Sequence, residues 1–174
     1  ANSQTESPCY LCAKMRRGAL YRIAKGYGCN KIALGHHYDD VIETTLMNML
    51  NAGSFQTMLP KLVSTNYEGM EVIRPMYLIR EADIIAFKNA NHLSFIQCAC
   101  RFTENCAVCD NGGGGSQRAK TKALIKELKQ NYNEFVDKNI FSSASKVQID
   151  KILGYEEMNK KHSFLDEYSK KKER

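Results

Sequence analysis

The sequence has no long hydrophobic run, and this lack excludes a class of protein. No apolar segment approaches the roughly 20 residues that a membrane-spanning helix requires. The first residues, Ala1 to Ser7, are polar and lack the apolar segment of a secretory signal peptide. We therefore expect a soluble, cytoplasmic protein with no membrane partner.

The sequence has seven cysteines but lacks the export signal that a disulfide-stabilised secreted protein would carry. Without an export signal, the reducing cytosol keeps thiols free. Apart from Cys29, which we expect to be a small core residue, the cysteines are grouped: Cys9-x-x-Cys12, Cys98-x-Cys100 and Cys106-x-x-Cys109. Two Cys-x-x-Cys pairs indicate metal binding or redox chemistry.

The first cysteine pair cannot complete a metal site alone. Structural zinc takes four ligands, so Cys9 and Cys12 need thiolates from the second group. An iron–sulfur cluster held by three protein thiolates would leave one iron open for chemistry. The spacing of the cysteines alone does not distinguish zinc from an iron–sulfur cluster. Thioredoxin-like exchange is disfavoured, because no suitable strand precedes Cys9.

Positive charge is in excess and unevenly placed. The formal net charge is +6, and five cations crowd one early segment: Lys14, Arg16, Arg17, Arg22 and Lys25. Clustered cations favour a polyanionic partner through counterion release. The alternative is an ordinary solvated helix face.

Hydrophobic spacing predicts strands alternating with helices, which is typical of a parallel α/β sheet. Only two strands are convincing, Lys31–Leu34 and Glu71–Ile73. The predicted helices cover Leu11–Lys25, Asp40–Asn51, Glu81–Ala90, Gln117–Gln130 and Val147–Leu153. We expect an α/β region over 1–110, a glycine-rich loop or linker over 111–116, and a helical extension over 117–174.

The turn after the first strand carries the densest set of polar residues. Gly35, His36, His37, Asp39 and Asp40 lie where a strand gives way to a helix, and ligands bind at such positions in open α/β sheets. The two aspartates are suited to hold Mg²⁺ on a nucleotide's phosphates. Asp40 is also expected to cap the helix. Zinc is disfavoured, because adjacent histidines project in different directions.

The glycine run 112–115 does not match a P-loop, since Ser116-Gln117-Arg118 follows it and no strand precedes it. Ser116 as a helix N-cap explains the run. An engineered Gly-Gly-Gly-Gly-Ser linker is the alternative.

Several ordered motifs lie between residues 8 and 100. They are Pro8-Cys9-Tyr10-Leu11-Cys12, Arg16-Arg17-Gly18, Lys31-Ile32-Ala33-Leu34-Gly35-His36-His37-x-Asp39-Asp40-x-x-Glu43-Thr44, Leu59-Pro60-Lys61-Leu62, Ile73-Arg74-Pro75 and Glu81-x-Asp83-Ile84. Together they resemble the tRNA 2-thiocytidine biosynthesis (TtcA) group of PP-loop tRNA thiolation enzymes, related to the TtuA and TilS proteins.

The resemblance implies an adenine-nucleotide alpha-hydrolase (HUP, PP-loop) fold and an ATP-dependent tRNA sulfurtransferase. Such an enzyme adenylates a cytidine-type base with ATP and Mg²⁺, then inserts sulfur through a cysteine-bound 4Fe–4S cluster. By resemblance, Cys9, Cys12 and either Cys98 or Cys100 hold the cluster. Residues at the ATP site would be Gly35, His36, Asp39, Asp40, Arg16 and Arg17, with Asp39, Asp40, Cys9 and Cys12 as the catalytic set. Cys106 and Cys109 have no counterpart.

The sequence departs from this family at the third cysteine, where Gln97 replaces the usual Pro and the spacing is Cys98-x-Cys100 rather than Cys-x-x-Cys, and more seriously in a second respect. The Ser-Gly-Gly-x-Asp-Ser motif and its strand are absent. We therefore expect the C-terminal part of the fold, inactive alone. The expected partners are tRNA, a sulfide or persulfide donor and a second copy in a homodimer. The alternative function is a non-catalytic RNA-binding module bearing zinc or a cluster.

Overall fold

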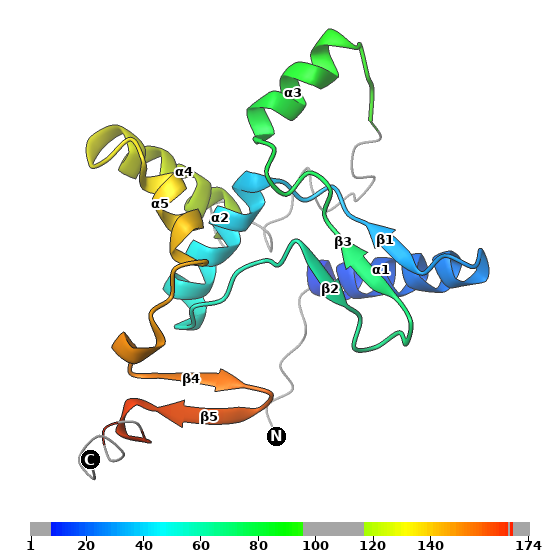
Figure 1. Cartoon of the computed structure of the whole chain (residues 1–174). Coiled ribbons are helices and arrows are strands. Elements are labelled where there is room, and N and C mark those ends of the chain that lie inside the picture. The colour runs from blue at the N-terminus through cyan, green and yellow to red at the C-terminus, as the bar shows by residue number, and fades with distance from the viewer. Residues whose placement is uncertain (1–7, 96–116, 167, 169–174) are drawn as a thin grey trace. The chain divides into compact units, whose positions relative to one another are not determined.

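The computed structural model describes residues 8–95, 117–166 and 168, with side chains from residue 11 onward (Figure 1). Contacts divide the chain into two compact units, Ala1–Phe141 and Ser142–Arg174. No helix within the described residues is long and apolar enough to cross a membrane. The expected boundary at 111–116 lies outside the described residues, so it stays a prediction.

A three-stranded sheet organises the first unit. Its strands are β1 (Lys31–Ala33), β2 (Lys61–Val63) and β3 (Glu71–Ile73), in the order β1-β3-β2. β1 pairs with β3 in parallel, which confirms the expected α/β arrangement, and β2 pairs with β3 in antiparallel. β2 was not predicted, because three residues with one half-buried side chain give too short a pattern.

Helix α1 (Pro8–Gly26) packs on this sheet through Tyr21. Tyr21 is buried in one cluster with Ile32, Met70 and Val72. Its ring stacks on that of Tyr67, with centroids 4.4 Å apart and planes 4° from parallel. Stacked aromatic pairs stabilise beyond their buried area, so this pair anchors the helix.

The buried face of α1 differs from the one its spacing suggested. The four-residue spacing of Leu11, Met15, Ala19 and Ile23 predicted the helix. Leu11, Met15 and Ile23 are nevertheless 48%, 67% and 55% exposed, and Ala19 is half-buried. Tyr67, which selects the buried face, lies on the distant β2–β3 connection. Cys29, expected in the core, is exposed as well.

Helix α2 (Tyr38–Met47) follows the turn after β1 and continues into a π-helical segment, Asn48–Ala52. The prediction that Asp40 is its N-cap is wrong. His37 is the N-cap: its Nδ1 accepts the Asp40 amide at 3.4 Å, and Asp40 Oδ2 accepts the His37 amide at 3.0 Å. This reciprocal capping box starts the helix at Tyr38.

Three more helices complete the first unit: α3 (Glu81–Ala90), α4 (Gln117–Asn131) and α5 (Val136–Ser143). α4 packs against α2. α5 was not predicted from the sequence. At its end, Phe141 stacks on Tyr38 of α2, with ring centroids 4.3 Å apart.

The second unit is a hairpin, so the helix expected over Val147–Leu153 is wrong. Only a 3₁₀ turn, Ile149–Lys151, forms there, and β4 (Gly154–Glu157) pairs with β5 (Lys160–Ser163). Met158 and Asn159 have φ values of 49° and 64°, as a two-residue hairpin turn of type I′ requires. A Cβ at Gly154 would lie 2.5 Å from the His162 oxygen, so glycine is required.

We predict that Tyr21→Ala lowers the free energy of unfolding by about 3 kcal/mol, because it leaves a cavity under α1 and removes the stacked pair. Urea denaturation followed by circular dichroism measures this. Tyr27→Ala, at a side chain that is 83% exposed, is the matched control and should change little. Equal losses in the two variants would contradict the role given to Tyr21.

Candidate functional site

A pocket of about 450 Å³ lies at the carboxyl end of β1. Its lining comes from α1, the three strands and the segments that follow β1 and precede β2. The lining residues are Ala13, Arg16, Arg17, Leu20, Tyr21, Ile32, Leu34, His36, Met58, Leu62, Val72 and Arg74. The polar side chains include three arginines and a histidine, and among the residues that the structure describes no carboxylate lines the pocket. This charge pattern suits an anionic ligand with an apolar part.

His36 is held in this pocket by Arg74. Arg74 Nε donates to His36 Nδ1 at 3.4 Å, and an Arg74 guanidinium nitrogen donates to the Leu59 carbonyl. Burial, and then the charge of Arg74, lower the pKa of His36, although Asp40 raises it in part. A neutral His36 whose Nδ1 accepts a hydrogen bond carries its proton on Nε2. Its Nε2–H is therefore available as a donor.

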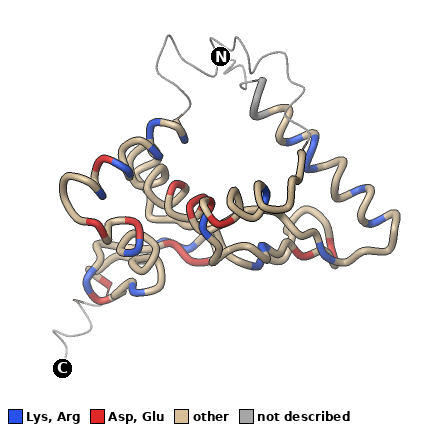
Figure 2. Tube along the Cα trace, turned by 90° about the horizontal axis from the view of Figure 1, so that it is seen from above, with Lys and Arg blue, Asp and Glu red and all other residues tan. Residues whose placement is uncertain are grey.

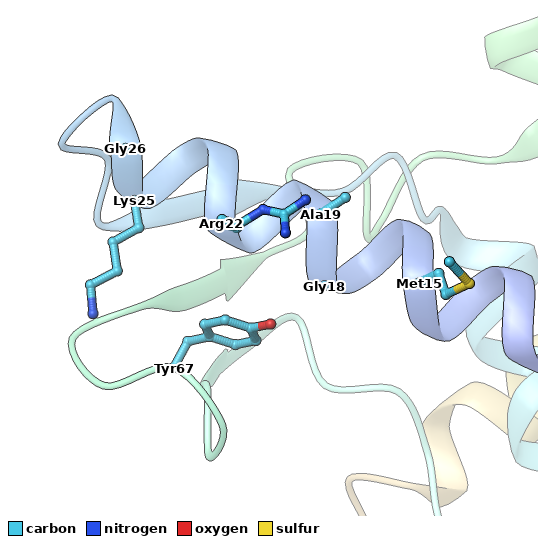
Figure 3. A pocket seen from close by; sticks show the side chains of 7 residues that line it. All are labelled: Met15, Gly18, Ala19, Arg22, Lys25, Gly26 and Tyr67. Carbon is cyan, nitrogen blue, oxygen red and sulfur yellow. The ribbon is translucent and has the colours of Figure 1, made fainter.

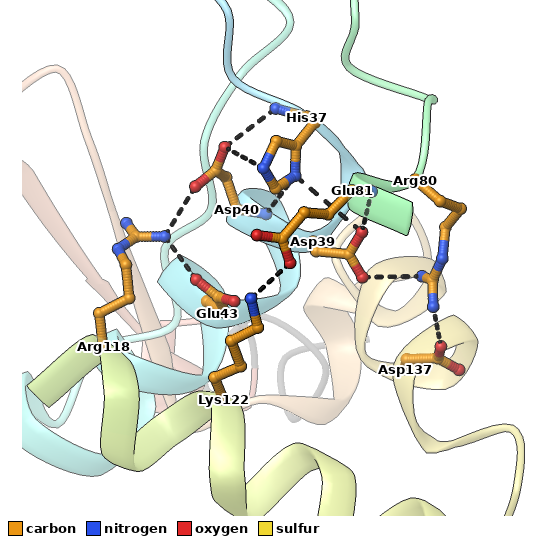
Figure 4. A network of polar contacts seen from close by, with 9 residues as sticks. All are labelled: His37, Asp39, Asp40, Glu43, Arg80, Glu81, Arg118, Lys122 and Asp137. Atoms are coloured by element: carbon orange, nitrogen blue, oxygen red, sulfur yellow. Dashed lines mark hydrogen bonds and ion pairs between the residues drawn. The ribbon is translucent and has the colours of Figure 1, made fainter. Parts of the chain in front are cut away.

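The two aspartates after this turn lie in a separate polar network (Figure 4). Asp39 Oδ2 accepts the Glu81 backbone amide at 2.8 Å, and Oδ1 lies 3.3 Å from Arg80 Nη1. The Arg80 N-cap of α3 makes no side-chain capping bond. Asp39 therefore caps α3 from a distance of 42 residues in sequence.

Arg118 of α4 bridges two carboxylates of α2. Its Nη1 lies 2.9 Å from Asp40 Oδ1 and 2.6 Å from Glu43 Oε2. The Glu43 side chain is only 7% exposed. A buried carboxylate without a countercharge costs several kcal/mol, so Arg118 neutralises a charge that could not otherwise be buried there.

The network continues along α3, α4 and α5. Lys122 pairs with Glu81, while Arg80 and Lys129 both pair with Asp137. Burial alone would raise the pKa of Asp137, but hydrogen bonds from Lys129 and Arg80 outweigh it and lower that pKa. The partner residues Arg80, Arg118, Lys122 and Asp137 were missed in the sequence, because no local pattern marks a charge whose partner is distant.

These contacts bear on the expected Mg²⁺ site. All four carboxylate oxygens of Asp39 and Asp40 contact a protein donor or cation. Within the described residues, no group of three or more His, Cys, Asp or Glu is placed to hold a metal ion. The donors are of the right chemical kind, and as arranged each of these oxygens is shared with a protein donor or cation.

The structure thus separates the predicted site residues into two sets. Arg16, Arg17 and His36 come together in the pocket, whereas Asp39 and Asp40 belong to the network. Gly35 lies in sequence between Leu34 and His36, which both line the pocket. A Cβ at Gly35 would meet Met76 Cε at 3.3 Å.

Part of the predicted cluster site lies within α1. Cys12 is exposed and forms no disulfide. Cys9 and Cys12 stand one helical turn apart on the backbone of α1, which places both positions on one side of the helix. Cys98, Cys100, Cys106 and Cys109 lie outside the described residues, so their roles stay predictions.

A model of the family described as PP-loop domain matches residues 11–101, more than half of the 174-residue chain. The chain belongs to the PP-loop family. Both strands of the parallel pair, His36 and both aspartates lie within the matched region. The fold class expected from the sequence is therefore confirmed.

Several curated relatives of this PP-loop chain have the same name. The "tRNA-cytidine(32) 2-sulfurtransferase" of Geotalea uraniireducens (strain Rf4) is 41% identical over 143 residues, which is 82% of this chain and 52% of the relative. The protein of that name from Syntrophotalea carbinolica is 49% identical over 92 residues, 53% of this chain and 35% of the relative. The chain spans about half the length of the curated relatives it matches.

A solved structure shows a related fold. It is the U34-tRNA thiolase NcsA from Methanococcus maripaludis with its 4Fe–4S cluster. The match has a TM-score of 0.56 and 19% identity, and covers 85% of this chain and 47% of that chain. At this identity the similarity supports the PP-loop fold alone.

We predict that Arg118→Ala lowers the free energy of unfolding by about 1–3 kcal/mol, because Glu43 and Asp40 lose their shared countercharge. Urea denaturation gives the value. Lys126→Ala, an exposed cation on the same helix, is the control and should change it little. In the double variant Arg118→Ala/Glu43→Gln, part of the loss should be recovered. A double variant as unstable as the sum of its singles would contradict the bridge.

We predict that His36 titrates below 6.5, its ordinary value, and that Arg74→Gln moves its pKa upward, because a positive charge beside the ring is removed. The folded state then binds a proton less readily than the unfolded state. The contribution of His36 to stability is therefore complete above pH 6.5 and declines as the pH falls below it. NMR titration of the ring protons, assigned with His36→Gln, measures both pKa values. A pKa above 6.5, or one unmoved by Arg74→Gln, contradicts the pairing.

Proposed function

We propose that this chain forms part of an ATP-dependent tRNA sulfurtransferase that converts a cytidine-type base into its 2-thio form. The observation that carries the proposal is the pocket at the carboxyl end of β1, where Arg16, Arg17, Arg74 and His36 gather and no carboxylate of the described residues joins them. The names of the curated relatives support the substrate class.

The pocket suits an adenine nucleotide by size and by chemistry. Its volume of about 450 Å³ falls within the range of small-molecule sites. Leu34, Leu62 and Val72 give it an apolar wall for a planar base. Arg16 and Arg17 on α1 supply guanidinium groups, which match phosphate oxygens in geometry and charge.

In the proposed reaction, the oxygen on the base carbon attacks the α-phosphorus of ATP and releases pyrophosphate. Sulfur then forms a bond to that carbon, and AMP leaves with the oxygen. The residues of the pocket would bind the phosphates, and His36 Nε2–H would donate to an oxygen that gains charge. When bound, the 4Fe–4S cluster supplies a site that carries the incoming sulfur.

The cysteines would hold that cluster. Cys9 and Cys12 are proposed as two ligands, with either Cys98 or Cys100 as the third. Their helical spacing in α1 supports the first two. Sulfide or a persulfide carrier would be the sulfur donor, and a homodimer remains an expectation.

The Mg²⁺ site at Asp39 and Asp40 and the requirement for a PP-loop motif also remain proposals. A metal ion would have to exchange with Arg80 or Arg118, which now contact these carboxylates. We propose that the 174 residues alone bind ATP poorly, because the Ser-Gly-Gly-x-Asp-Ser motif is absent from them. Under this proposal, residues 1–110 belong to the ATPase domain, 111–116 form a loop or linker, and 117–174 an extension.

The second candidate is a non-catalytic RNA-binding module that carries zinc or a cluster. The pairing of Asp39 with Arg80 and of Asp40 with Arg118 favours it, because these cations already balance the carboxylate charge that would attract Mg²⁺. Metal content separates the two candidates: bound iron with a broad visible absorbance band supports the enzyme, and colourless protein with zinc supports the module.

We predict that the complete enzyme of which this chain is proposed to form part, prepared anaerobically, binds iron, and that Cys12→Ser in it lowers the iron content and removes 2-thiocytidine from tRNA digests analysed by mass spectrometry. Cys29→Ser, which changes an exposed cysteine outside the cysteine groups, is the control and should retain both the iron and the thiolation.

Arg16→Ala/Arg17→Ala should weaken ATP binding, measured by calorimetry, about tenfold or more while the iron is retained. Full thiolation by Cys12→Ser would overturn the cluster proposal, and pyrophosphate release by the 174 residues alone would overturn the PP-loop requirement.

A further inference from the structure

Helix α1 bears a second depression that the proposed nucleotide site does not use (Figure 3). Its volume is about 720 Å³. Six residues of α1 line it together with Tyr67 from the β2–β3 connection: Met15, Gly18, Ala19, Arg22, Lys25 and Gly26. We refer to it as the α1 groove.

The α1 groove lies on a different side of the helix from the nucleotide pocket. Gly18, Arg22 and Lys25 recur at the three- and four-residue spacing that places side chains on one face. Arg16 and Arg17 are offset from that face and line the other pocket. One helix therefore presents cations on two sides.

The cations of the α1 groove have no countercharge nearby. Arg22 and Lys25 form no ion pair with any carboxylate in the described parts of the chain, whereas Arg80, Arg118 and Lys122 each form at least one. Figure 2 shows the Lys and Arg positions of the chain in blue and the Asp and Glu positions in red. The sequence of α1 contains five basic residues and no acidic residue. An exposed row of unpaired cations attracts a polyanion.

The groove is shaped for an extended polymer backbone rather than for a single large side chain. Gly18, Ala19 and Gly26 keep its α1 wall low. Figure 3 shows Lys25 extending away from the helix on the side of Tyr67 and Arg22 running along the helix toward Ala19, with the Tyr67 hydroxyl directed toward the helix at Gly18. A Cβ at Gly18 would lie 3.5 Å from that hydroxyl oxygen, so glycine leaves space beside it.

Tyr67 adds a fixed polar group to this surface. Its ring is held flat against Tyr21, with centroids 4.4 Å apart. Within the described residues, its hydroxyl group makes no hydrogen bond, while its backbone carbonyl accepts the Met70 amide. A rigid ring with a free hydroxyl loses little entropy when it binds, and tyrosine is a common contact to phosphate groups.

We propose that the α1 groove binds the sugar–phosphate backbone of RNA. Arg22 and Lys25 contact phosphates, and the Tyr67 hydroxyl donates to a phosphate or ribose oxygen. The identification of this RNA as a tRNA rests on the proposed function. The groove would hold a part of the tRNA that lies apart from the modified base.

The arrangement favours RNA over a membrane surface or an acidic peptide. A membrane-surface helix gathers its apolar side chains on one face, but here Met15, Arg22 and Lys25 share a face. An acidic peptide gains specificity from side-chain pockets, and the α1 wall of small residues offers none. Phosphates repeated along a backbone match cations repeated along a helix.

The test compares two double variants that each remove two positive charges. Arg22→Ala/Lys25→Ala alters the α1 groove, and Lys88→Ala/Lys126→Ala removes two exposed lysines from α3 and α4. Binding of an unmodified tRNA transcript, without nucleotide, is followed by fluorescence anisotropy over a series of salt concentrations. Circular dichroism checks that both variants are folded.

We expect Arg22→Ala/Lys25→Ala to weaken tRNA binding about tenfold and to lower the slope of log K against log salt by about one to two. The control double variant should change affinity less than about twofold. Tyr67→Phe keeps the stacked ring, and it should weaken binding about twofold to tenfold by loss of one hydrogen bond.

Equal losses in the two double variants would mean that only diffuse charge matters, and would overturn the proposal. So would unchanged binding by Arg22→Ala/Lys25→Ala, or groove-dependent binding of polyglutamate or phosphatidylserine vesicles in preference to tRNA. ATP binding and thiolation are measured in parallel in the complete enzyme of which this chain is proposed to form part, because the 174 residues alone are proposed to bind ATP poorly. Groove-dependent tRNA binding without thiolation would refute the enzyme and keep the groove, whereas thiolation with groove-independent tRNA binding would refute the groove alone.

Discussion

The neutralisation of one buried carboxylate sets the arrangement of the helices around the site. Glu43 lies in the interior between α2 and α4, where an uncompensated charge is too costly to keep. Arg118 removes this cost and reaches Asp40 with the same nitrogen. Asp40 in turn holds the His37 amide, which fixes the start of α2. The turn that carries His36 into the pocket therefore depends on a contact made from α4.

Local signals explain the parts of the fold that could be predicted. The apolar run before Gly35 marked β1, and the following polar turn marked the start of a helix, although the cap is His37 rather than Asp40. Four-residue spacing located α1 correctly. The same spacing chose the wrong buried face, because Tyr21 is buried by a stack with Tyr67, which is far away in sequence.

Long-range partners explain what could not be predicted. Arg118 and Glu43 are 75 residues apart, and Arg80 and Asp137 are 57 apart. Each of these residues looks like an ordinary surface charge in its own segment, and only folding gives it a partner. The hairpin of β4 and β5 was not predicted for a related reason. Its turn residues, Met158 and Asn159, adopt positive φ values, which were not predicted from the sequence.

The order β1-β3-β2 has a consequence for how the sheet can grow. Among the described strands, β1 pairs on one side only, so the amides and carbonyls of its other edge can accept a further strand. A strand added there in parallel would end at the same edge of the sheet as β1, beside Leu34 and His36. Its following turn would then lie at the edge of the sheet where the pocket lies. The sheet is thus open at the position from which one more backbone turn would enclose a bound anion.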